Sequence, residues 1–130
     1  MSQRQRGTGR PRSFQVDFST EIPAGTPTND PLEVARTIPY DGRIKTLVVG
    51  WSSGSSYLAG VRLEYGDGEG LFPRIGDEDD GFIPGDGFTH PFDLEADIQA
   101  DNDLVAKYAN ADPDNSHYIN VLATIEEEGE

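Results

Sequence analysis

The sequence predicts an all-β protein, a single antiparallel β-sandwich of jelly-roll type that follows an extended basic N-terminal arm. Apolar and polar side chains alternate with a period of two along most of the chain, which is typical of strands with one buried face. Turn-forming residues interrupt this alternation at intervals of about 8–12 residues, as in sandwiches and barrels. A helix fits only residues 31–36 and 93–108, where a single turn near residues 94–99 is allowed.

We expect about seven to nine short strands. They are placed, in order, near residues 14–18, 32–36, 44–51, 58–65, 71–72, 88–94, 104–108 and 117–125. The strands at 58–65 and 117–125 are the clearest, because large apolar residues alternate there without interruption. Turns such as Asp41-Gly42 separate the strands, since Asp and Gly tolerate the positive φ of tight turns.

Composition divides the chain into three parts. Residues 1–13 form a flexible arm with four arginines and no acid. Residues 14–125 form the sandwich domain, which is long enough to bury a core of its own. Residues 126–130 form an acidic tail.

The charge of the chain indicates its environment. All 24 acids lie after residue 13, so that a body of formal charge −18 carries an arm of +4. Such a body repels itself in dilute buffer, and this self-repulsion destabilises the compact state. At molar ionic strength the Debye length falls to about 3 Å, which screens the repulsion. We therefore interpret the chain as halophilic, from a haloarchaeon or one of its viruses.

Several function classes are disfavoured. The chain has no cysteine, which excludes disulfides and Cys-ligated zinc. No apolar run approaches the roughly 20 residues of a transmembrane helix, and no signal peptide is visible, so no membrane partner is expected. No catalytic residues are expected, because no nucleophile–base pair or metal motif occurs. His90 and His117 lie on expected strands, where packing is a plainer interpretation than acid–base or metal chemistry.

Two acidic loops raise the question of calcium. Asp77, Asp79 and Asp80 in one loop, and Asp112 and Asp114 in another, offer the oxygen ligands that Ca²⁺ prefers. The first loop departs from an EF-hand, because a glycine stands where the third acid is required. Solvated loop tips of a halophilic chain are the other interpretation, and the sequence requires no cofactor.

The arm is a candidate contact with a partner through Arg4, Arg6, Arg10 and Arg12. Three interpretations stay open: binding of nucleic acid, a tether that lies on an acidic protein neighbour, and a terminus without a role. Nucleic acid is disfavoured, because the acidic body opposes docking and high salt weakens phosphate contacts. A tether is favoured, since the neighbouring proteins of a halophile are acidic too.

Four apolar residues stand at loop or strand-end positions, namely Trp51, Phe72, Phe82 and Ile83. Apolar side chains on loops often anchor an interface. The alternative is that the loops fold back and bury these side chains in the core. They are therefore candidate interface anchors, and their burial in the folded protein separates the two interpretations.

Four stretches carry a resemblance to a known class of proteins. They are residues 22–27 (IPAGTP), residues 44–49 (IKTLVV), residues 60–66 (GVRLEYG) continuing to Pro73, and residues 108–112 running into 116–121. Over roughly residues 14–125 the chain resembles small jelly-roll-like β-sandwich structural proteins of tailed virions, of the capsid decoration, turret or spike type. The resemblance implies a subunit that oligomerises on a virion and has no catalytic activity.

Three function hypotheses follow. The first is a capsid decoration or turret subunit of a haloarchaeal tailed virus, which assembles with itself as a trimer or pentamer and binds the major capsid protein or other virion proteins through its arm. It would be found on the capsid surface, and in the host cytoplasm during assembly. The second is a glycan-binding host-recognition module of a tail or fibre, with Trp51, Tyr57 and Tyr65 stacking on sugars. The third is a cellular halophilic binding protein.

Overall fold

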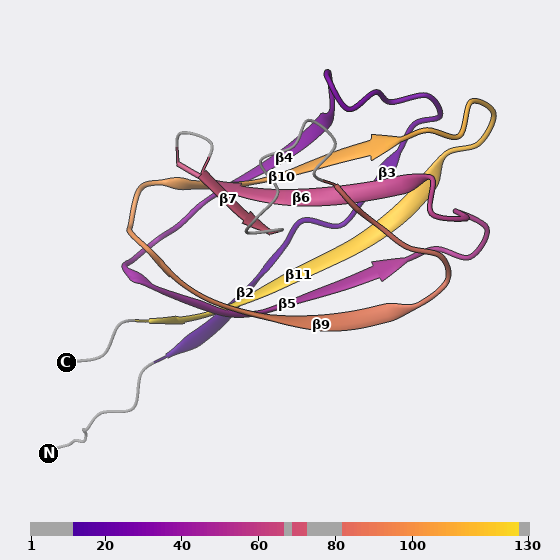
Figure 1. Ribbon diagram of the computed structural model, residues 1–130. Coiled ribbons are helices and arrows are strands. Elements are labelled where there is room, and N and C mark those ends of the chain that lie inside the picture. Colours follow the sequence, from indigo (N-terminus) through magenta and orange to yellow (C-terminus); the bar gives the residue numbers. More distant parts are fainter. Residues whose placement is uncertain (1–11, 67–68, 73–81, 128–130) are drawn as a thin grey trace, which may run out of the picture.

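The computed structural model describes residues 12–66, 69–72 and 82–127 of the 130-residue chain. These residues form two antiparallel sheets that lie one above the other as two layers (Figure 1). Within them there is no helix, and so none that is long and apolar enough to span a bilayer. Some expected site residues lie outside the described residues: Arg4, Arg6, Arg10, Asp77, Asp79, Asp80 and the side chain of Phe72.

Each layer is named here after its central strand. The β6 sheet has the order β4 (Leu32–Thr37), β10 (Asp103–Asn110), β6 (Ala59–Tyr65) and β7 (Glu69–Phe72), and β8 (Ile83–Pro84) also pairs with β6. The β5 sheet has the order β2 (Ser13–Asp17), β11 (His117–Glu127), β5 (Gly42–Trp51) and β9 (Thr89–Ile98), and β3 (Thr20–Ile22) also pairs with β11. Every pairing between these strands is antiparallel.

The strand order is that of a jelly roll. β2 and β3 lie along the same strand, β11, and together act as one interrupted strand; β7 and β8 do the same along β6. Counted in this way, the described strands run 1-8-3-6 in the β5 sheet and 2-7-4-5 in the β6 sheet. The fold class predicted from the sequence, an all-β antiparallel sandwich, is therefore confirmed.

The core lies between the two layers and follows the alternation of the sequence. On β11, Ile119, Val121, Ala123 and Ile125 are buried, whereas the side chains between them face outward. β6 and β10 keep the same parity and contribute Val61, Leu63, Leu104 and Ala106, whereas on β5 the parity changes at the register shift between Ile44 and Thr46, so that Ile44 faces the core together with Leu47 and Val49. Burial of each large aliphatic side chain contributes about 1.5–3 kcal/mol.

One polar side chain links the layers from within the core. Tyr108 of β10 is fully buried, and its hydroxyl donates a hydrogen bond to the carbonyl oxygen of Phe18, which lies between β2 and β3. Burial raises the pKa of Tyr108 well above its ordinary value, so the hydroxyl stays protonated and remains a donor. A buried hydroxyl without a partner would be destabilising, so this bond holds β10 against the opposite sheet.

Residues 94–98 continue β9, and the helical turn that the sequence allowed near 94–99 is absent. Leu94, Ala96 and Ile98 all face the core with a period of two, which a helix would not permit. Glu95 has a φ of 54° and lies where the register between β5 and β9 shifts. This bulge carries the Glu95 carboxylate to 3.0 Å from the Nζ of Lys45.

Both ends of the described chain lie at the same end of the sandwich (Figure 1). β2 begins at Ser13, and β11 continues to Glu127. Glu126 and Glu127 pair with Arg43 and Gly42 of β5. Two residues of the expected acidic tail thus extend the sheet.

Candidate interaction surface

At one end of the sandwich, the loop after β5 is bound to the segment between β8 and β9. Backbone and side-chain hydrogen bonds connect residues 51–58 with residues 85–88. They join Trp51 N to Phe88 O (2.9 Å), Gly87 N to Ser52 O (3.2 Å), Gly54 N to Asp86 Oδ1 (2.9 Å) and Ser55 Oγ to Gly85 O (2.7 Å). We call these two segments the loop pair.

Trp51, the first residue of the loop pair, turns its ring beneath the other residues of the pair and belongs to the core. It is 4% exposed, and its Nε1 donates a hydrogen bond of 3.2 Å to the carbonyl oxygen of Ile83. Gly85 packs directly on the indole, while the ring of Phe88 lies 5.0 Å from it, centroid to centroid. Trp51 supports the loops from inside, so in the monomer its ring is not available to a partner.

The other expected anchors with described side chains are also partly covered. Ile83 is half-buried and packs against the core. Phe82 is half-buried as well, and its ring centroid lies 6.0 Å from the guanidinium carbon of Arg62 on the outer face of β6. The segment thus lies against the sandwich, and the role of Phe82 and Ile83 as interface anchors stays a prediction.

Four other side chains are the exposed large hydrophobic groups of the described chain. Tyr57, Leu58, Phe88 and Tyr118 are 61%, 41%, 41% and 44% exposed. The first three belong to the loop pair. Tyr118 is joined to it, because Ser52 N donates to the Tyr118 carbonyl (3.0 Å) and Tyr118 N donates to Ser52 Oγ (3.2 Å). We call these four side chains the apolar rim.

The sequence analysis named only Tyr57 among the rim residues as a candidate binder. A signal was present for Tyr118, which alternates outward between the buried His117 and Ile119. Leu58 had the same signal, because it is out of step with the buried Ala59, Val61 and Leu63 of the expected strand 58–65, whereas Phe88 gave none. Their gathering depends on hydrogen bonds between segments about 30 or more residues apart, such as Ser55 to Gly85 and Ser52 to Tyr118.

The loop between β10 and β11 is closed by Asp112. Its Oδ1 accepts hydrogen bonds from the backbone N–H groups of Asp114 (3.0 Å) and Asn115 (3.2 Å), and its Oδ2 lies 2.8 Å from Nε2 of the buried His117. The bond from the Asp114 backbone, with those of His117 and Asn115, lowers the pKa of Asp112 to about 2. Asp112 is thus held as a carboxylate.

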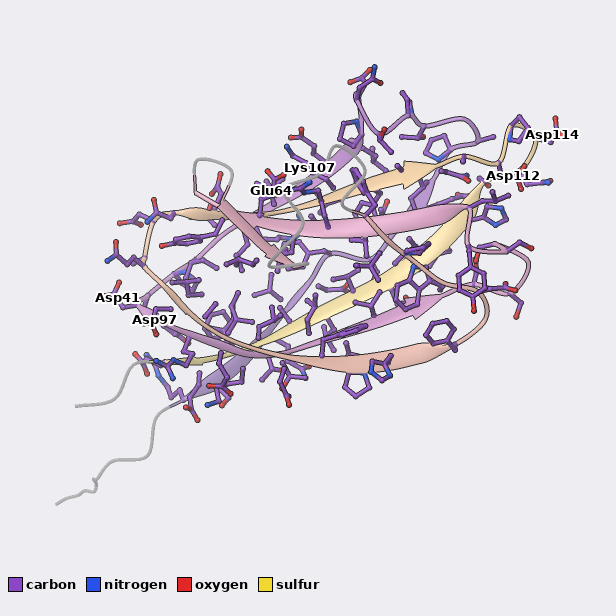
Figure 2. All side chains as sticks on the ribbon, in the orientation of Figure 1. Asp41, Glu64, Asp97, Lys107, Asp112 and Asp114 are labelled. Carbon is purple, nitrogen blue, oxygen red and sulfur yellow. The ribbon has the colours of Figure 1, made fainter. Side chains whose placement is uncertain are left out.

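This arrangement bears on the calcium hypothesis. Asp112 and Asp114 lie in the same loop (Figure 2), but the Asp112 oxygens are directed at N–H donors. Across residues 12–66, 69–72 and 82–127, no three acidic or histidine side chains are grouped as ligands of a metal ion. The oxygens of Asp112 are therefore occupied by the hydrogen bonds that close the loop.

Arg12, the one arm arginine within the described residues, is bound to its own chain. Its Nε and Nη2 donate to the two carboxylate oxygens of Glu127 at 2.7 and 2.8 Å, and Glu127 N donates to the Arg12 carbonyl at 2.7 Å. The guanidinium also lies 4.8 Å from the ring centroid of Tyr40. The Glu127 carboxylate raises the pKa of Arg12, and Arg12 lowers that of Glu127. The arm therefore leaves the body at a fixed point beside the end of β11.

The outer face of the β6 sheet carries a chain of charged groups. Glu64 is buried, with its two carboxylate oxygens 2.9 Å from Arg62 Nε and 3.0 Å from Lys107 Nζ, and Glu33 lies 3.9 Å from the same Lys107 (Figure 2). Arg62 Nε is buried and makes no aligned hydrogen bond within the described residues. These contacts connect β4, β10 and β6, so we assign them a structural role.

The three side chains expected to bind a sugar do not come together. Trp51 is buried, and Tyr57 precedes β6 whereas Tyr65 ends it. A strand of this length separates its two ends by about 20 Å. The Tyr65 hydroxyl accepts hydrogen bonds from Gln99 N (2.7 Å) and Asn102 Nδ2 (3.2 Å), which fixes the turn between β9 and β10.

Comparisons with known proteins give a likeness of fold. No protein-family model and no curated protein matches the sequence. Among solved structures, the chain is similar to one in the cyanophage Pam1 capsid asymmetric unit, with a TM-score of 0.55, 11% identity, and coverage of 98% of this chain and 93% of that one. At this identity the match shows a shared fold.

Two further solved structures are similar at lower TM-scores. One is a family two carbohydrate esterase from Cellvibrio japonicus (TM-score 0.44, 9% identity, 92% of this chain and 35% of that one). The other is infectious bursal disease virus, Gx strain (TM-score 0.45, 14% identity, 94% of this chain and 33% of that one).

Proposed function

We propose that this protein is a structural protein of a virion, a capsid decoration or turret subunit of a haloarchaeal tailed virus. The observation that carries the proposal is the jelly-roll fold, which the chain has in common with a chain of the cyanophage Pam1 capsid asymmetric unit. The similarity spans nearly the whole of both chains, so the two are also alike in size. Such a subunit would act by assembly and would need no catalytic group.

The arm is the proposed contact with neighbouring virion proteins. Arg12 is clamped to Glu127, so the arm starts from a defined place on the body. Arg4, Arg6 and Arg10 precede this clamp and carry positive charge toward a neighbour. An acidic major capsid protein, or another acidic virion protein, would be complementary to them. The symmetry of a capsid favours a trimer or pentamer of the subunit.

The net charge supports a halophilic setting for this assembly. A formal charge of −14 on 130 residues makes copies of the protein repel one another in dilute buffer. Concentrated salt removes most of that repulsion, because the Debye length at molar ionic strength is about 3 Å. Close packing on a particle is therefore compatible with this composition when the medium is a brine.

The test is where the protein is found. Particles banded by density from the source culture, and the particle-free lysate, would be compared by quantitative mass spectrometry, with immunogold labelling to distinguish capsid from tail. We expect the protein in the particle band in constant proportion to the major capsid protein, with gold on the capsid. Recovery in the particle-free lysate alone would overturn the proposal in favour of the cellular halophilic binding protein.

A further inference from the structure

The turn that carries Tyr57 is conformationally strained. Leu58 N donates to Ser55 O at 2.8 Å, and the two central residues, Ser56 and Tyr57, have φ values of 50° and 62°. Turns with positive φ at both centres strongly favour Asn-Gly, because a large side chain at positive φ is disfavoured sterically. The Tyr57 side chain is exposed, so burial in its own core does not compensate for this strain. Strain of this kind is found where a side chain is held for a contact.

Three chain segments next to this turn are poor in acids, although Glu21 of β3 pairs with Tyr118 at their edge. Residues 50–61, 82–92 and 115–125 contain a single acid, Asp86, although 24 of the 130 residues of the chain are acidic. The three stretches adjoin one another, since Gly50 pairs with Thr89 on one side and with Asn120 on the other. Loss of charged residues together with exposed aromatic residues is typical of the centre of a protein interface. We call these three stretches the acid-poor surface.

We propose that the apolar rim and the acid-poor surface form the contact between two copies of this chain. Copies of charge −14 repel, and contact through acid-rich regions would place like charges opposite each other. The acid-poor surface can meet the same surface of another copy with few acids opposed, namely Asp86 within it and Glu21 beside Tyr118. The Tyr57, Phe88 and Tyr118 rings would then be removed from water, as aromatic residues at interface centres are.

This inference rests on the proposed function only in taking self-assembly as the use of the surface. It also makes the roles of arm and rim distinct. Salt weakens a contact made by arm arginines, whereas excluded salts such as sulfate strengthen one made by apolar burial. In a brine, the rim would hold copies of the protein to each other, and the arm would add contacts with other virion proteins.

The test measures self-association of the full chain by sedimentation velocity in molar KCl, with and without added ammonium sulfate. The variants are Tyr57→Asp and Tyr118→Asp, which add an acid to the rim. The matched control is Ala35→Asp, which adds an acid at an exposed position on the outer face of the opposite sheet. Tyr57→Asp is suited to the test because Asp tolerates positive φ better than Tyr, so the variant remains folded.

We expect the wild-type chain to form oligomers, and more of them with sulfate. Each rim variant should weaken association by at least about tenfold, as loss of a central interface aromatic does. Ala35→Asp and deletion of residues 1–11 should leave association unchanged.

Three results would overturn the inference. They are a wild-type chain that stays monomeric up to its solubility limit, an equal loss in Ala35→Asp, and loss of association on deletion of the arm. If the wild-type chain stays monomeric and instead binds glycans through Tyr57, the inference of a contact between copies is overturned. The location of the protein in particles is measured separately, so failure of the virion proposal would leave these outcomes intact.

Discussion

Gly85 and Trp51 are in direct contact, and the glycine has no room for a side chain. A Cβ built on Gly85 would lie 2.3 Å from the indole Cδ2 of Trp51. The contact holds the segment before β9 onto the loop after β5, and the apolar rim is built on these two segments.

Gly85→Ala should therefore destabilise the fold. The added methyl group must displace either the indole or the backbone of the loop pair, and overpacking of this kind costs about 1–3 kcal/mol. Urea unfolding should give a lower free energy of unfolding for Gly85→Ala than for the wild type. The fluorescence emission of Trp51, the single tryptophan, should shift to the red in the folded variant. In the control Gly25→Ala, the Cβ meets open space at a φ of 73°, so backbone strain lowers stability without changing Trp51 emission. Unchanged emission and stability in Gly85→Ala would contradict the observed packing.

Tyr57→Asn should stabilise the folded chain while it removes a rim aromatic. Asn adopts positive φ at lower cost than Tyr, so we expect a gain of up to about 1 kcal/mol in the free energy of unfolding. Tyr118→Asn makes the same change at an ordinary strand position and should give no such gain. Thermal unfolding of the two variants side by side is the measurement, and equal effects would show that the turn at Tyr57 is not strained.

Asp112→Asn should lower stability near neutral pH, because the variant lacks the carboxylate that His117 Nε2 and three N–H groups of the loop contact. The pKa of Asp112 is lowered to about 2 in the folded chain, from an ordinary value of about 3.9. The stabilisation by the carboxylate is therefore complete above the ordinary value and is lost as the pH falls through the folded one.

The measurement is the difference in free energy of unfolding between wild type and Asp112→Asn, followed from neutral pH downward. Below about pH 4 this difference should shrink as the pH falls toward 2. Comparing the two proteins cancels the protonation of the many other carboxylates. A difference that stays constant to pH 2 would mean that the Asp112 carboxylate has no special stability in the fold.

Stability should rise with salt concentration. The chain carries a formal charge of −14, and the Debye length shortens from about 10 Å at 0.1 M to about 3 Å at 1 M ionic strength. Exposed pairs such as Arg43–Asp97 would weaken, but solvent already screens such pairs, so their loss has little effect on stability. Urea unfolding in KCl, followed by Trp51 fluorescence, is suitable because urea adds no ions. Greatest stability in the most dilute buffer would contradict the halophilic interpretation.

Deletion of residues 1–11 should leave a folded body that no longer joins particles. The deletion removes Arg4, Arg6 and Arg10 but keeps Arg12, whose two hydrogen bonds to Glu127 close the end of β11. We expect circular dichroism and thermal unfolding close to those of the full chain, and loss of the protein from reconstituted or complemented virions. Substitution of the three arginines by glutamine separates charge from length. Normal incorporation of the truncated chain would refute the tether.

Much of the fold was predictable because strand parity is a local property. The alternation around Val121 and Leu63 identified the inward side chains, and the same parity places Trp51 in step with Leu47 and Val49, which face the core. The position of Trp51 next to a Ser-Gly loop instead suggested exposure. Parity was the better guide, since a strand side chain keeps its face up to the last paired residue.

The sequence by itself determined the all-β class, the inward and outward faces of β6, β10 and β11 and the acidic character of the body, because each depends on residue type and on near neighbours in the chain; the irregularity that turns Ile44 of β5 inward was not among them. Tertiary structure alone decided which distant segments meet: Arg12 with Glu127, Asp112 beside the ring of His117, and the loop pair that gathers the apolar rim. These contacts depend on the order and register of strands that are far apart in sequence. Alternation of period two tells which face a residue takes, but not which strand will lie next to it.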